Sequence, residues 1–299
     1  MIKHKELIDK YKSYIKNIIP IEILDIGAKG SIPRELHSIS DIINITGFEP
    51  NQDEFIRLNS LENINYLPFA IGKENIEESL YITKYPSSTS LYKIDEDIVS
   101  RFWDYENLQV VKEEKIKCVN LNFLLENKKI NQPNFLKIDV EGAEYDVLEG
   151  ASEIISNDSC LGIKIECRFD TWYVNSKNIP NKTFSEIDIY LRKFGYKLYD
   201  LKTFNHGRKS LNHTYTLMNK GETVPGGSTK YGQISVCDAI YFKDPVLKNN
   251  NLRFDTKDPN LIKMAILMDV YSQFDSAAEI LKILSKKDVI FKDILNFYY

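Results

Sequence analysis

The sequence predicts an α/β domain with a mostly parallel sheet and helices on both of its faces. Short β-branched runs alternate with amphipathic stretches over most of the chain, and this alternation is typical of parallel sheets with crossover helices. Several of the runs end at glycine or an acidic residue, as strands do at a ligand-binding sheet edge. The last part of the chain, residues 247–299, changes to purely helical periodicity and predicts a small helical extension.

The first third of the chain carries the clearest alternation. The run Ile-Glu-Ile-Leu-Asp-Ile stops at Gly27, as a buried strand would. The elements predicted here are, in order, strand 21–26, helix 34–43, strand 43–48, helix 53–60 and strand 64–70. This order indicates a Rossmann-like fold.

The middle of the chain is less regular and then returns to the same pattern. Residues 72–119 contain a predicted loop at 86–90 and a predicted edge strand at 113–119. The elements after it are helix 121–127, strand 135–140, one helix from Ala143 to Ile155, strand 161–167, helix 184–194, and closing strands 196–201 and 237–242, the last of them antiparallel. The polar stretch 202–233 between the closing strands predicts a long loop, and loops of that length are usually functional or disordered.

The two ends predict helical additions to the main domain. Residues 1–16 form an amphipathic pattern without the apolar core of a signal peptide. A linker at 248–251 precedes two helices within 260–286. We therefore expect an N-terminal helix in 1–19, the main domain in 20–246 and a helical extension in 247–299, which packs on the main domain or mediates a homodimer.

Composition excludes several classes of protein. The net charge of −4 and the pI of about 5.7 argue against a general nucleic-acid binder. No run is long and apolar enough to span a membrane. The four cysteines have no C-x-x-C spacing and indicate free thiols in a reducing compartment, so we expect a cytoplasmic protein.

Two strand ends indicate a nucleoside-containing ligand. Asp25-Ile-Gly27-Ala28-Lys29-Gly follows the first strand, and Glu49 ends the second. An acidic residue at this spacing can hold both hydroxyls of a ribose. The loop lacks G-x-G-x-x-G, and Asp25 suits an ammonium group better than a pyrophosphate. The pattern therefore favours S-adenosylmethionine over a nicotinamide cofactor.

The strongest motif follows the predicted strand 135–140. It delivers Asp139 and Glu141 to the carboxyl edge of the sheet, where ligands bind in open α/β sheets. Glu144 and Asp146 are explained by the electrostatics of a helix start. Asp139 is not, because an acid directly after a buried strand needs a partner.

The run Lys-Ile-Asp-Val-Glu-Gly-Ala-Glu at 137–144, followed by Val-Leu-Glu-Gly-Ala at 147–151, resembles the signature of FkbM-type methyltransferases. Gly-Phe-Glu-Pro-Asn at 47–51 is similar to the family's second motif and Asp-Ile-Gly-Ala at 25–28 to its first. The resemblance spans residues 20–244. The sequence departs from this pattern after Gly-Ala. Similar sequences often carry Asn or His there, with the next glycine one residue later, whereas this chain has Lys29 followed by Gly30.

The resemblance implies a class I methyltransferase fold, S-adenosylmethionine as the cofactor, and transfer of a methyl group to oxygen. By position it places Asp25, Gly27 and Ala28 on the methionine portion, with Lys29 pairing its carboxylate. It places Glu49 and Pro50 at the ribose and Ala70 and Ile71 at the adenine, with Asp139 near the methyl-donor centre. The family tendency predicts a small-molecule or glycan-precursor acceptor, methylated on a sugar hydroxyl.

Candidates for the base that accepts the hydroxyl proton are Asp139, Glu141, Glu166 and His206. No metal site is predicted; the alternative is one divalent ion shared by Asp139 and Glu166. A nicotinamide-dependent oxidoreductase and a non-catalytic interaction protein remain as other function classes.

Overall fold

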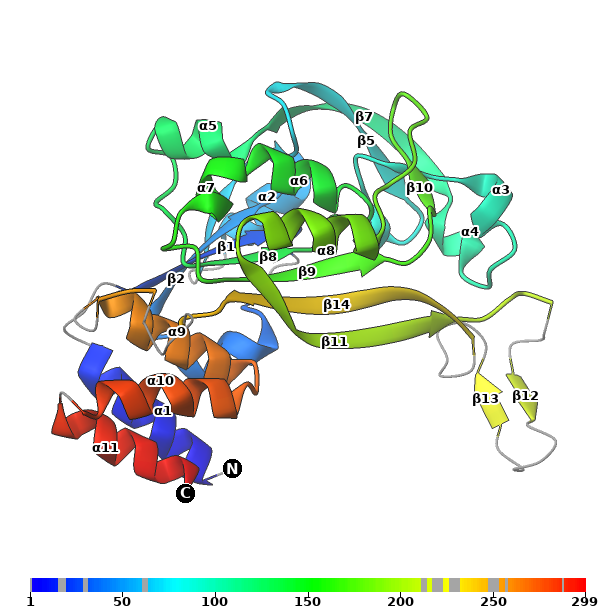
Figure 1. Cartoon of the computed structure of the whole chain (residues 1–299). Coiled ribbons are helices and arrows are strands. Elements are labelled where there is room, and N and C mark those ends of the chain that lie inside the picture. Colours follow the sequence, from blue (N-terminus) through cyan, green and yellow to red (C-terminus); the bar gives the residue numbers. More distant parts are fainter. Residues whose placement is uncertain are drawn as a thin grey trace.

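The structure, a computed structural model, describes residues 2–15, 20–28, 32–60, 64–210, 214–216, 223–225, 232–246, 253–255, 258–286 and 288–299. Its centre is a seven-stranded sheet in the order β3–β2–β1–β8–β9–β14–β11 (Figure 1). The strands are β1 Ile21–Ile26, β2 Ile43–Phe48, β3 Asn65–Leu67, β8 Phe135–Ile138, β9 Gly162–Arg168, β11 Tyr196–His206 and β14 Gln233–Lys243. β14 is antiparallel to both of its neighbours, and the other pairs are parallel. This arrangement confirms the predicted fold class.

One face of the sheet is covered by the helices that connect the strands. They are α5 Leu121–Glu126, α6 Glu144–Gly150, α7 Ser152–Ser156 and α8 Phe184–Lys193. Alternate residues of the central strands, such as Ile26, Ile138 and Ile165, enter one core with apolar residues of these helices. Strand side chains point alternately to the two faces, so the intervening residues face the opposite side.

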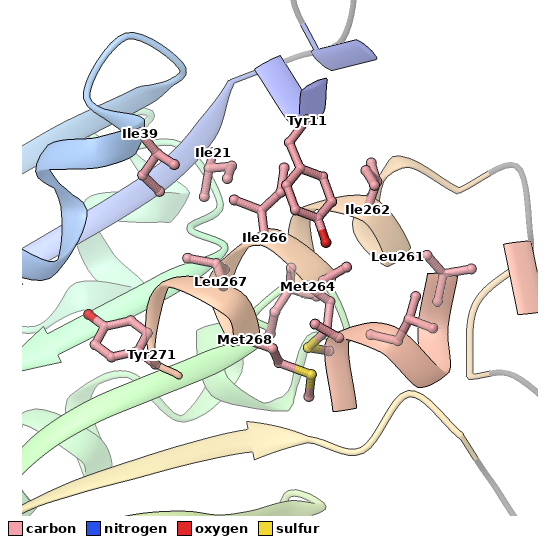
Figure 2. Close-up of a cluster of buried hydrophobic side chains, with 14 of the residues drawn as sticks. Tyr11, Ile21, Ile39, Leu261, Ile262, Met264, Ile266, Leu267, Met268 and Tyr271 are labelled. Atoms are coloured by element: carbon pink, nitrogen blue, oxygen red, sulfur yellow. The ribbon is translucent and has the colours of Figure 1, made fainter. Parts of the chain in front are cut away.

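The opposite face is covered at its amino end by both termini of the chain. Figure 2 shows Tyr11 of α1 (Ile2–Ile15) and Ile21 of β1 meeting side chains of α9 (Pro259–Val270). α10 (Phe274–Leu284), α11 (Val289–Leu295) and η4 (Asn296–Tyr298) complete this bundle, which lies below the sheet in Figure 1. Tyr298 donates a hydrogen bond of 2.8 Å to buried Asp269 of α9, and its hydroxyl lies 3.0 Å from that of Tyr11. The helical extension therefore packs on its own main domain.

A second, three-stranded sheet stands beside the carboxyl edge of the first, and here two predictions are wrong. The expected strand 64–70 divides into β3 and β4 (Ala70–Ile71), which belong to different sheets. Pro68, which lacks a backbone N–H, stands at the break. The expected edge strand 113–119 is part of β7 (Val110–Val119), which lies between β4 and β5 (Ile76–Thr83).

Three further elements differ from the sequence predictions. The helix at 34–43 is a short 3₁₀ helix, η1 (Arg34–Ile39), and the helix at 143–155 is divided into α6 and α7 at Ala151. Part of the polar stretch 202–233 is strand and not loop, because β11 continues to His206, which pairs with Gln233 at the start of β14. β12 (Thr214–Thr216) and β13 (Thr223–Pro225) form a hairpin beyond the ribbon (Figure 1).

The remaining short elements complete the body of the domain. They are α2 Gln52–Asn59, η2 Pro86–Ser88, β6 Lys93–Ile94, α3 Glu96–Val99, α4 Tyr105–Leu108 and β10 Tyr173–Val174. Among the helices that the structure describes, none has the length and apolarity needed to cross a bilayer.

Candidate active site

A cavity of about 460 Å³ opens at the carboxyl edge of the central sheet. Its size lies in the usual range for small-molecule sites, about 300–1,000 Å³. The strand ends of β1, β2 and β8 form its floor, and β5 with the segment after it forms a wall. The lining includes Gly27, Ala28, Phe48, Glu49, Pro50, Ala70, Ile71, Leu80, Ile82, Ser90, Leu91, Asp139, Val140 and Glu141. Seven of the residues predicted to bind the cofactor therefore gather here.

The loop after β1 touches the loop after β8 backbone to backbone. Gly27 has a φ of 86°, and a Cβ at this position would lie 1.8 Å from the carbonyl oxygen of Asp139. Both the left-handed conformation and the close approach require glycine. The contact fixes the first predicted loop against the strongest sequence motif.

Glu49 presents its carboxylate at the end of β2. Its Oε1 accepts a hydrogen bond of 2.7 Å from the backbone N–H of Asn51, and Asn51 in turn caps α2 by accepting from the N–H of Glu54 at 3.0 Å. Burial is the main cause that raises the pKa of Glu49 to about 7. The carboxylate thus keeps a fixed orientation and acceptor capacity beyond the bond to Asn51.

The wall beside Glu49 is apolar. Phe48, Ala70 and Ile71 come from the ends of β2 and β4, and Leu80 and Ile82 face them from β5. Ala70 and Ile71 are buried in the protein apart from this cavity. Such a slot suits a flat, weakly polar ring.

Asp25 lies beneath the cavity and does not line it. It is 2% exposed, and its Oδ1 is 3.0 Å from Nζ of Lys137, which is also 3.5 Å from Oδ2 of Asp139. Burial lowers the pKa of Lys137, but the two carboxylates outweigh this effect and leave the pKa raised. Asp25 therefore acts on the site through Lys137, and the predicted contact residue Lys29 lies outside the described residues.

The turn between β8 and α6 has an unusual backbone. Glu141 has a φ of 57° and Gly142 a φ of 107°, and a Cβ at Gly142 would lie 2.9 Å from the Tyr173 side chain. The buried carboxylate of Glu144 accepts hydrogen bonds from the N–H groups of Val140 at 3.1 Å and Gly142 at 3.0 Å. Glu144 thus holds the turn in place, and a non-glycine left-handed residue such as Glu141 is often found at functional sites.

Three carboxylates meet at the inner end of the cavity. One oxygen each of Asp139, Glu141 and Glu166 lies within 4.8 Å of the others. Burial raises the pKa of Glu166 well above its usual value; Arg168 lowers it, while Glu141 and Asp139 raise it further. The raised pKa means that Glu166 binds a proton more readily than an exposed carboxylate does.

Arg168 and Tyr173 organise the acid cluster. The sequence suggested Arg168 as one of two partners for Glu166 but did not connect Tyr173 with the acids. Nη2 of buried Arg168 lies 2.5 Å from Oε2 of Glu141 and 3.4 Å from Oε2 of Glu166. The Tyr173 hydroxyl donates to the same Glu141 oxygen at 3.2 Å. A useful signal was that Arg168 follows Glu166 by two residues, which places both on one face of β9.

His206 lies apart from the cavity lining. Its Nδ1 hydrogen-bonds the hydroxyl of Ser235, and its Nε2 is 3.3 Å from Oδ2 of Asp104. Its ring also contacts Trp172 edge-on at 5.1 Å between centroids. Because both ring nitrogens are engaged, His206 serves here to join the end of β11 to β14 and to the start of α4.

Comparisons with known proteins add a family and a set of distant folds. The sequence model described as "Methyltransferase FkbM domain" matches residues 34–198. Solved structures similar to the chain include precorrin-6y C5,15-methyltransferase from Geobacter metallireducens (10% identity, 80% of this chain and 88% of that chain, TM-score 0.32). They also include 1,6-didemethyltoxoflavin-N1-methyltransferase from Burkholderia thailandensis (8% identity, 81% of this chain and 78% of that chain, TM-score 0.30). A third is magnesium protoporphyrin IX methyltransferase from Synechocystis (8% identity, 80% of this chain and 80% of that chain, TM-score 0.29). No curated protein matches the sequence.

Proposed function

Because the chain belongs to the FkbM methyltransferase family, we propose that it methylates a sugar hydroxyl of a surface-glycan precursor, with S-adenosylmethionine as its methyl donor. The methyltransferase fold and the donor follow from the family. Transfer to oxygen and the glycan acceptor are the proposal. It is supported by the family tendency toward sugar and natural-product hydroxyls and by the chemistry of the cavity.

The observation that carries the proposal is the place of Glu49. Its carboxylate stands at the cavity beside an apolar slot, which matches the ribose hydroxyls and the adenine ring of the donor. Gly27 and Ala28 line the cavity at the end of β1, where the proposal places the methionine portion. The donor supplies an electrophilic methyl group on a sulfonium centre. The residues present therefore fit the donor.

The acceptor would meet the acid cluster. Asp139 and Glu141 both line the cavity. We assign receipt of the hydroxyl proton to Asp139, which would share it with Glu166 in the same cluster. Glu141 is held by Arg168 and Tyr173 and would position the cluster. Proton transfer to a placed carboxylate contributes about 10²–10⁴-fold in typical enzymes. His206, with both ring nitrogens engaged, is the weakest of the four predicted bases.

The charges of the cluster favour a neutral acceptor group at the reacting position. Four carboxylates, Asp25 and the three of the cluster, share the two cations Lys137 and Arg168, and a phosphate placed here would be repelled. Arg168 already supplies positive charge among the acids, so we propose a metal-independent reaction. A divalent ion between Asp139 and Glu166 is the alternative, and loss of transfer in excess EDTA would support that alternative.

The test is transfer of a labelled methyl group to a panel of nucleotide sugars. We expect a product whose label survives mild alkali, as a methyl ether does and a methyl ester does not, and whose mass spectrum places it on the sugar. Asp139→Asn should lower the turnover by about 10²-fold, because the amide cannot accept the hydroxyl proton. A label found only on nitrogen or on a carboxylate would contradict the proposal. The homodimer and the cytoplasmic location stay predictions.

A further inference from the structure

A second cavity of about 310 Å³ lies next to the first. Leu91 lines both cavities. A Cβ on Gly72 would lie 3.7 Å from Leu91 Cδ1 and 2.7 Å from Cys118 Sγ, so Gly72 and Cys118 of the second cavity lie close to Leu91. The other lining residues come from the start of β5 and the residues before it, from Tyr92 before β6, from α6 and from the segment after β10. Among them are Lys73, Tyr92, Tyr145, Asp146, Ser176 and Lys177.

The lining offers many hydrogen-bonding groups. Tyr92 donates a hydrogen bond of 3.0 Å to Oδ2 of Asp146, whose other carboxylate oxygen adds acceptor capacity. The Ser176 hydroxyl stands 3.4 Å from a carboxylate oxygen of Glu78 across the mouth. The half-buried ring of Tyr145 lines the same space. Hydroxyls, carboxylates and an aromatic face together suit a ring that carries several hydroxyl groups.

The charged groups of this lining compensate one another. Nζ of Lys73 lies 3.1 Å from Glu149, and Nζ of Lys182 lies 2.8 Å from Glu186. Four acidic and three basic residues line the cavity, so no single sign of charge dominates it. Electrostatic complementarity therefore favours an uncharged ligand.

We propose that the second cavity binds a further, uncharged sugar unit of the acceptor, next to the unit that is methylated. The inference rests on the proposed function and deepens it, because it makes the substrate a chain of at least two units. One unit would lie at the acid cluster in the first cavity and its neighbour in the second cavity, with Leu91 lining the space of both. Such a subsite would raise affinity without taking part in the chemistry.

The experiment uses saturation-transfer NMR on the full chain with saturating S-adenosylhomocysteine, with maltose, lactose and cellobiose as probes. Ser176→Trp narrows the mouth of the second cavity from an exposed position. Ser60→Trp is the matched control, because Ser60 is exposed and lines neither cavity. We expect disaccharide signals for the parent protein and Ser60→Trp, and a loss of at least about fivefold for Ser176→Trp. Lys177→Trp, on the same rim, should repeat this loss.

Calorimetry with S-adenosylhomocysteine separates the two proposals. Unchanged binding of that ligand in all four proteins, together with the loss of disaccharide signals in both rim variants, supports the subsite. Disaccharide signals that persist in both rim variants, or are missing from the parent protein, overturn it. Stronger signals for putrescine or glucose 6-phosphate than for the disaccharides would also overturn it, since the ligand class would be charged. Absence of S-adenosylhomocysteine binding in the parent protein would instead count against the proposed function.

Discussion

Replacing Glu49 with Gln separates the charge of this side chain from its shape. Oε1 of Glu49 accepts the N–H of Asn51 at 2.7 Å, and the amide oxygen of Gln can keep this bond. The carboxylate's remaining acceptor sites, which we assign to the donor ribose, are replaced by an amide NH₂ that cannot accept. We therefore expect the variant to fold and to bind the donor poorly.

The expected magnitudes follow from the environment of Glu49. Loss of one hydrogen bond to a charged group costs about 1.5–3 kcal/mol, so S-adenosylhomocysteine should bind about 10–150-fold more weakly. The free energy of unfolding, in contrast, should rise in the variant. The pKa of Glu49 is raised from 4.5 to about 7, mainly by burial, so its ionisation costs stability as the pH rises through 7. Neutral Gln avoids this cost, which is at most about 3 kcal/mol and about 1–2 kcal/mol after solvent screening.

The assay is calorimetric titration of S-adenosylhomocysteine as a function of pH, paired with urea unfolding. Only ionised Glu49 accepts both ribose hydroxyls, so affinity in the parent protein should fall about tenfold between about pH 8 and about pH 6. Glu49→Gln should show a flat profile over the same range. Glu54→Gln is the matched control, because Glu54 also lines the cavity but its hydrogen bond to Arg57 keeps its pKa lowered. Its profile should match the parent.

Two results would refute this reasoning. If Glu49→Gln bound S-adenosylhomocysteine as tightly as the parent protein, Glu49 would not hold the ribose. If the variant were weaker but kept the same pH profile, the titrating group would be another acid, and the acid cluster around Asp139 would be the first to examine.

Three further substitutions test the framework of the site by urea unfolding. Gly27→Ala should lower the free energy of unfolding by at least about 2 kcal/mol, because the new Cβ would lie 1.8 Å from the carbonyl oxygen of Asp139. A loss below about 0.5 kcal/mol would show that the loops after β1 and β8 can move apart without strain. Arg168→Met should lower the free energy of unfolding by about 3–5 kcal/mol at neutral pH, since it leaves buried carboxylates without their cation. This loss should be smaller in acid, where the carboxylates are protonated, and equal losses at both pH values would contradict the reasoning. Asp269→Ala should cost about 1–3 kcal/mol through the lost bond from Tyr298, and an unchanged midpoint would show that the bond is replaced by water.

The sequence predicted the parts of the site that depend on local pattern. Strands β1, β2 and β8 are short apolar runs with clear ends, so Gly27, Glu49 and Asp139 could be placed at one sheet edge before the structure was known. All three line the cavity. Asp25 was placed at the same edge, but whether it touches the ligand or a buried lysine depends on side-chain direction, and Lys137 on the neighbouring strand decides it.

Elements whose pattern depends on partners far along the chain were not predicted. The closing strands 196–201 and 237–242 were predicted, but β11 continues to His206 and β14 begins at Gln233. The added residues of β11, Lys-Thr-Phe-Asn-His, are mostly polar and resemble a loop. The second sheet joins β4, β5 and β7, and β4 has only two residues, too few for any periodicity. Arg168 and Tyr173 meet Glu141 only because β9 and β10 pack against the turn that follows β8.

The motif at 137–144 is best understood as a folded turn in which each polar residue has a different task. Lys137 joins Asp25 to Asp139 beneath the cavity, while Glu144 ties the backbone of Val140 and Gly142 from behind. These contacts hold Glu141 in its left-handed conformation, which costs about 1–3 kcal/mol on its own. The conformation turns the carboxylate of Glu141 toward Arg168 and leaves Asp139 beside the cavity. The spacing of the motif therefore places two neighbouring acids in two different environments: Glu141 is held by Arg168 and Tyr173, and Asp139 lies beside Lys137 at the cavity.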